Sequence, residues 1–93
     1  MLFRSEIESE IVAHEGCVDQ PTAAKLVQVG ESSRNLKGHG LDEGMSTRLL
    51  IYAAQLIAQG VDATAACRMA LIAPLTDDPD LRDTLGAAVD TYF

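Results

Sequence analysis

The sequence predicts an all-α fold, a compact bundle of about five short helices. Apolar residues recur at helical spacing, and no segment alternates apolar and polar residues over the length of a strand. Most apolar residues are alanine or aliphatic, with two Phe, two Tyr and no Trp, and such side chains let helices pack closely. We therefore expect residues 1–93 to form one small domain with a modest core.

The first predicted helix begins at Glu6 and ends at Gly16. Ser5 and Glu8 have the spacing of a capping box, which marks a helix start. Its apolar positions predict a buried face, whereas Glu6 and Glu10 are expected to face water. The expected buried side chains are Ile7, Ile11 and His14, with Phe3 preceding them.

The second predicted helix runs from the Asp19 cap to about Asn35. Pro21 suits its first turn, where the missing N–H is not needed. The expected core face consists of Ala23, Leu26, Val27 and Gly30. A loop follows at 36–44 that contains three glycines, and loops of this kind often carry binding residues.

The third predicted helix has the clearest periodicity in the chain. Ser46 or Thr47 caps its start, and Gly60 supplies a left-handed stop. One face is apolar and comprises Leu49, Leu50, Ala53, Leu56 and Ile57. The opposite face comprises Arg48, Tyr52, Gln55 and Gln59.

The last two helices begin at aspartate caps. Asp62 starts the fourth helix two residues after Gly60, so the third and fourth helices should form an αα-hairpin, and Pro74 ends the fourth. Asp78 and Pro79 start the fifth helix. The expected core faces are Ala63, Ala66, Cys67, Ala70 and Leu71, then Leu81, Leu85, Ala88, Val89 and Tyr92.

Arg48 stands out because a cation in the first turn opposes the helix dipole, at a cost of about 0.3–1 kcal/mol. A helix N-terminus beside an arginine is also an anion site. From position alone, two interpretations stay open: an anion-contacting arginine, or a solvated one that extends away from the helix end.

The charge distribution argues against nucleic-acid binding. The net charge is −7, and the basic residues concentrate at 21–73 between two acidic ends. A helix-turn-helix at 47–73 fits the short turn but not this acidic surface. No apolar run is long enough to span a membrane, and residues 1–6 lack the pattern of a secretory signal. We expect a cytoplasmic protein.

Catalytic and metal-binding patterns are absent from the sequence. Cys17 and Cys67 are expected to be free thiols, and His14-x-x-Cys17 has no second ligand pair, since His39 stands alone. No phosphate-binding Gly-x-x-x-x-Gly-Lys-Ser/Thr loop or Gly-x-Ser-x-Gly nucleophile motif occurs. We therefore expect this chain to hold no metal ion and to catalyse no reaction alone.

Several segments in order resemble the C-terminal domain of the CbbQ/NirQ/NorQ family of MoxR-type AAA+ ATPases. The resemblance covers nearly the whole chain, and the order and spacing of the segments together make it specific. The segments are 11–15, 34–36, 44–53, 66–68 and 74–79.

The resemblance implies that the chain is the helical lid over ATP held by a preceding AAA+ core domain. Ser46, Thr47 and Arg48 match the sensor 2 motif, so Arg48 would reach the γ-phosphate and Ser46 and Thr47 would cap its helix. Arg34 is a weaker candidate for contact with the nucleotide or a neighbouring subunit. Its alternative role is a solvated cation that complements the dipole at its helix end.

The resemblance also implies hexameric, chaperone-like rings that use ATP to activate a partner enzyme, such as Rubisco or nitric oxide reductase, with a von Willebrand A-domain protein. The AAA+ core domain, with its Walker motifs, is absent from this sequence. The chain is then an excised domain, a truncated product or a stand-alone relic. The alternative is a free-standing acidic helical module that binds other proteins.

Overall fold

The computed structural model describes residues 4–35 and 44–93, with side chains described from residue 6 onward. Every regular element in these ranges is helical, which confirms the predicted all-α fold. The elements are α1 (Arg4–Gly16), α2 (Gln20–Asn35), α3 (Thr47–Ala58), α4 (Ala63–Cys67), the π-helical turn η1 (Arg68–Ile72) and α5 (Pro79–Tyr92). None of them is long and apolar enough to cross a bilayer.

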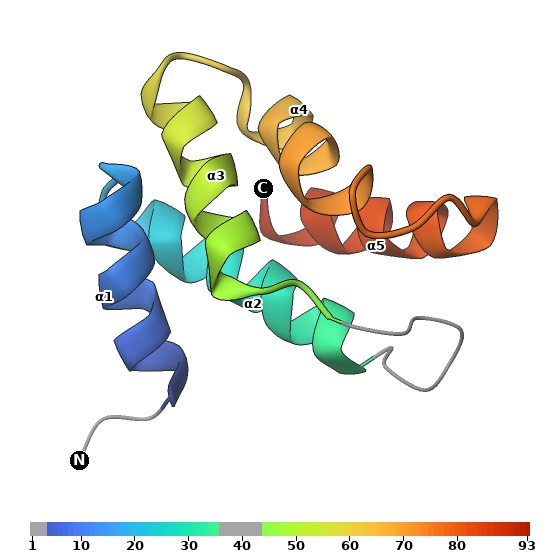
Figure 1. Cartoon of the computed structure of the whole chain (residues 1–93), viewed down its shortest axis with the longest axis horizontal. Helices are drawn as coiled ribbons and strands as arrows, with labels where there is room; N and C mark the ends of the chain where they lie inside the picture. Colours follow the sequence, from blue (N-terminus) through green and yellow to red (C-terminus); the bar gives the residue numbers. More distant parts are fainter. Residues whose placement is uncertain (1–3, 36–43) are drawn as a thin grey trace.

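The helices surround one core (Figure 1). α2 contacts α1, α3 and α5, while α3 lies between α1 on one side and α4 with η1 on the other. The largest fully buried side chains come from five different parts of the chain: Leu26, Met45, Leu50, Leu71 and Leu85. Each element between α2 and α5 therefore contributes to the same core.

The predicted core faces of α2 to α5 are confirmed. Ala23, Leu26, Val27 and Gly30 are buried in α2. Leu50 and Ala53 are buried in α3, and its other predicted core residues are partly buried. The remaining buried positions of the predicted faces are Ala66, Cys67, Ala70, Leu71, Leu81, Leu85 and Val89.

The predicted buried face of α1 is wrong. Ile7 and Ile11 are 45% and 43% exposed, and His14 is also exposed. Glu8 and Val12 are buried instead, so the helix is turned by about 100°, the step of one residue. Glu8 can be buried because Arg34 and Thr47 bond its carboxylate.

The starts of α2 to α5 follow the predicted caps, with two refinements at helix ends, whereas α1 begins at Arg4 and not at the predicted Glu6. Ser46, not Thr47, is the N-cap of α3, since its Oγ accepts a bond from the Leu49 N–H. Gly60 has φ 99°, but at the end of α1 the left-handed residue is Cys17, with φ 60°. Gly16 packs closely on Ala54, where a Cβ would collide with that residue's own Cβ. The glycine thus serves close contact between α1 and α3.

Candidate functional site

The candidate site is the start of α3, where Ser46, Thr47 and Arg48 follow one another. Ser46 has an extended backbone, and its Oγ lies 3.3 Å from the Leu49 nitrogen. This bond satisfies one of the N–H groups that a helix start leaves without a partner in the helix. The cap fixes where the helix begins and so where Arg48 leaves it.

A buried carboxylate lies directly beside this helix start. Glu8 is 4% exposed, and Arg34 binds it with two parallel bonds, Nη1 to Oε1 at 2.8 Å and Nη2 to Oε2 at 2.7 Å. Thr47 Oγ1 donates to the same Oε2 at 2.6 Å. One carboxylate therefore joins α1, α2 and the first residue of α3.

Residues Ser33 and Arg34 also hold the backbone that enters α3. Arg34 donates from Nε and Nη2 to the Met45 carbonyl oxygen at 3.2 and 3.0 Å. The Met45 N–H donates to Ser33 Oγ at 2.9 Å. Below we call Glu8, Ser33, Arg34, Met45 and Thr47 the Glu8 network.

The Glu8 network stabilises and orients the charged guanidinium of Arg34. Its hydrogen bonds to the Glu8 carboxylate are the main reason that the pKa of Arg34 is raised above its usual value, and partial burial opposes this rise. The guanidinium thus remains charged and oriented toward the protein interior. The prediction that Arg34 could be a solvated cation at its helix end is therefore wrong.

Arg48 has a different environment from Arg34. Its side chain is exposed, and it makes no hydrogen bond or ion pair within the part of the chain that the structure describes. It lies on the exposed side of α3 with Tyr52, which is half exposed. Among the four predicted site residues, Arg48 alone extends into solvent with its charge available to a ligand.

Glu8 belongs to this site, although its sequence context does not indicate it. The Ser5-x-x-Glu8 spacing pointed to a local cap, and nothing in that pattern connects Glu8 to a residue 26 positions later. The signal present was the combination of a glutamate between apolar helix positions and an arginine in the segment 34–36. Neither half identifies the other without the fold.

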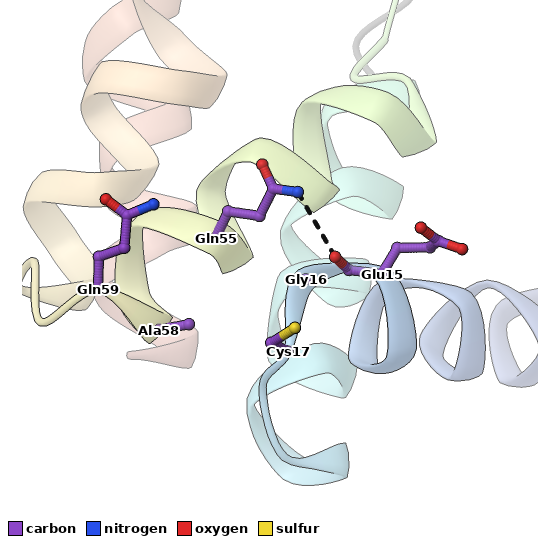
Figure 2. A pocket seen from close by; sticks show the side chains of 6 residues that line it. All are labelled: Glu15, Gly16, Cys17, Gln55, Ala58 and Gln59. Carbon is purple, nitrogen blue, oxygen red and sulfur yellow. Dashed lines mark hydrogen bonds between the residues drawn. The ribbon is translucent and has the colours of Figure 1, made fainter.

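An open pocket of about 440 Å³ lies at the other end of α3, lined by Glu15, Gly16, Cys17, Gln55, Ala58 and Gln59. Figure 2 shows the Gln55 side chain directed at the end of α1, where its amide donates to the Glu15 carbonyl oxygen at 3.5 Å. Two to three helical turns separate this pocket from Arg48. The pocket therefore belongs to a different surface from the predicted site.

The two cysteines have opposite environments, and neither is in a disulfide. Cys17 is exposed beside the pocket (Figure 2), whereas Cys67 is buried in the core. Burial raises the pKa of the Cys67 thiol to about 12, so it stays protonated at neutral pH. Over the described residues, no group of three potential ligands is arranged to hold a metal ion.

We expect the folded protein to react with one equivalent of a thiol reagent, at Cys17. The second equivalent, at Cys67, should react only after unfolding, because a buried neutral thiol is a poor nucleophile. Because the pKa of Cys67 is raised in the folded state, its contribution to stability is present at neutral pH. It should fall as the pH rises from the unfolded value toward about 12. Counting thiols before and after denaturation, with Cys17→Ser as control, checks this; two fast equivalents would contradict it.

Comparison with known proteins identifies the family of this chain. The family model described as CbbQ/NirQ/NorQ C-terminal matches residues 8–92, from the buried glutamate of α1 to the end of α5. The chain belongs to this family. It corresponds to the C-terminal domain that the model describes, as the resemblance of its segments predicted.

Individual relatives support the assignment. The chain is 65% identical over 88 residues to Protein CbbQ of Hydrogenophilus thermoluteolus, covering 95% of the chain and 33% of that protein. It is 46% identical over 82 residues to Denitrification regulatory protein NirQ of Pseudomonas aeruginosa, covering 88% and 31%. Protein NorQ of Paracoccus denitrificans is 44% identical over 75 residues, covering 81% and 28%. The chain thus spans about a third of the length of these relatives.

Proposed function

We propose that this domain is the lid of an AAA+ ATPase and that Arg48 contacts the γ-phosphate of ATP bound by a core domain. The observation that carries the proposal is the contrast between two neighbouring arginines. Arg34 is bonded inside the domain on every nitrogen, whereas Arg48 is exposed at a capped helix start and has no partner in the described structure.

Elementary electrostatics supports an anion as the partner of Arg48. A cation in the first turn is repelled by the positive end of the helix dipole, by about 0.3–1 kcal/mol. A bound phosphate reverses this sign, because both the helix N-terminus and the guanidinium attract it. ATP is then the expected nucleotide, and Mg²⁺ and the attacking water are held by the core domain, so this domain alone does not hydrolyse ATP.

The wider proposal follows the family. We expect rings in which this domain contacts its own core domain and a neighbouring subunit in the cytoplasm. Their ATP turnover would activate a partner enzyme, with Rubisco and nitric oxide reductase as the candidate classes and a von Willebrand A-domain protein as adaptor. One relative, NirQ of Pseudomonas aeruginosa, is described as a denitrification regulatory protein, which supports a regulatory role for this chain.

The proposal is tested by joining this chain to the preceding two-thirds of the Hydrogenophilus thermoluteolus relative and measuring ATP turnover. We expect Arg48→Ala to lower kcat by roughly a hundred- to a thousandfold, as when a charged transition-state contact is removed. The matched control is Arg82→Ala, since Arg82 is also exposed and its contacts are local: its Nε donates to the Thr76 carbonyl oxygen at 2.9 Å and its Nη2 lies 3.8 Å from Asp77 Oδ1. Full turnover by the Arg48→Ala protein would refute the assignment.

A second candidate function rests on a separate observation, the exposure of Ile7 and Ile11 on α1. Two half-exposed isoleucines one turn apart are suited to contact with another protein. A free-standing interaction module would use this face without a nucleotide. ATP turnover that depends on Arg48 in the joined protein would favour the lid over this module.

A further inference from the structure

The buried Glu8 carboxylate of α1 bonds both Arg34 of α2 and Thr47, the residue preceding Arg48. We infer that Glu8 is a positioning residue: with Arg34, it sets the direction in which Arg48 leaves the first turn of α3. This inference rests on the proposed contact between Arg48 and ATP. It adds a residue from a different helix, which has no contact with the nucleotide in this account.

Arg48 has no internal contact in the described structure to orient it. With no partner for its guanidinium in the described structure, its position depends on the backbone at the start of α3. Helix ends fray, and the Ser46 cap constrains only the bond within its own turn. The placement of Arg48 relative to the rest of the domain therefore has to come from the residues just before it.

The Glu8 network fixes the residues just before Arg48 through contacts with other helices. The Met45 carbonyl oxygen accepts two hydrogen bonds from Arg34, and the Met45 N–H donates to Ser33 Oγ. Both backbone polar groups of Met45 are therefore held by α2. Thr47 is held by Glu8 of α1. The residue on each side of Ser46 is thus attached to a different helix, and Arg48 follows immediately.

Glu8 differs from Glu31, the other carboxylate partner of Arg34. Glu31 also pairs with Arg34, whose Nη1 donates to Glu31 Oε1 at 3.3 Å, but the Glu31 side chain is 45% exposed. Glu31 has no bond to Met45 or Thr47 among the described residues, whereas Glu8 bonds Thr47 directly. Removing the charge of Glu31 leaves the connection to α3 intact, which makes Glu31→Gln the matched control.

The test uses the joined protein described above, with Glu8→Gln made in the original sequence and in Arg48→Ala. We expect Glu8→Gln alone to lower kcat roughly tenfold with unchanged affinity for ADP, since a small misplacement of a catalytic contact costs this much or more. In the Arg48→Ala protein, Glu8→Gln should cause no further loss. Glu31→Gln should leave kcat unchanged in both.

A milder pair of variants keeps the test valid where Glu8→Gln weakens folding. Thr47→Val removes only the hydroxyl that bonds Glu8 and should lower kcat several-fold, whereas Thr47→Ser should restore turnover. Hydrogen exchange at the Met45 amide should become at least roughly tenfold faster in Glu8→Gln, with the amides of α5 unchanged.

Three results would overturn the inference, and a fourth would overturn the proposed function instead. Equal fold-losses from Glu8→Gln with and without Arg48 would indicate a general structural role, and unchanged exchange at Met45 would show that Glu8 does not order this segment. If Arg48→Ala lowers turnover but Glu8→Gln does not, only the positioning role fails. If Arg48→Ala keeps full turnover, the proposed ATP contact itself fails.

Discussion

Replacing Arg34 with alanine is expected to lower the free energy of unfolding by about 3–5 kcal/mol, the cost of removing one partner of a buried ion pair. Glu8 would lose two short charged bonds, and the Met45 carbonyl would lose two more. A domain of this size has a total stability of about 5–15 kcal/mol. Urea unfolding of the isolated 93-residue chain, followed by circular dichroism, measures the loss.

Two variants control this experiment. Glu31→Gln removes the more exposed partner of Arg34 and should cost less than about 1 kcal/mol, as is usual for surface pairs. Arg34→Lys keeps the charge but not the planar pair of donors, so its loss should fall between the two. An Arg34→Ala protein as stable as Glu31→Gln would show that the Glu8 network does not hold the three helices together.

The fold followed from the sequence because its signals are local. Ser46, Asp62 and Asp78 act as caps at the predicted positions. The helical spacing of apolar residues from α2 to α5 identified the buried faces, since a helix exposes one stripe and buries the other. These features depend on neighbours within one turn, which are visible in the chain itself.

The orientation of α1 was not predictable in this way. Ile7 and Ile11 have the spacing of a core face, yet the structure buries Glu8 and Val12 in their place. Burying a carboxylate is normally unfavourable, so sequence reasoning places it outside. Here the compensation comes from Arg34, on another helix, and only the assembled fold reveals it.

The candidate site also combines features that the sequence predicts with features that only the fold reveals. The helix start at Ser46 and Thr47 was predictable because it depends on consecutive residues, whereas the bond of Thr47 to Glu8 was not. The role of Arg34 was not, since its orientation depends on Glu8 and on the Met45 carbonyl. The half-exposed isoleucines of α1 were likewise hidden from the sequence, because the same residues would serve a core equally well.

The second large effect concerns nucleotide discrimination by Arg48. If its guanidinium contacts the γ-phosphate, Arg48→Ala should weaken ATP binding by roughly ten- to a hundredfold, the range for a hydrogen bond to a charged group. ADP lacks this phosphate, so its affinity should be unchanged. Arg82→Ala, the exposed control on α5, should change neither affinity.

The most direct test of this account is therefore the ratio of ATP to ADP affinity in the joined protein, measured by titration calorimetry under conditions that prevent hydrolysis. If Arg48 contacts the γ-phosphate, Arg48→Ala should lower this ratio by roughly ten- to a hundredfold through ATP alone. An unchanged ratio, or an equal loss of affinity for both nucleotides, would contradict contact between Arg48 and the γ-phosphate.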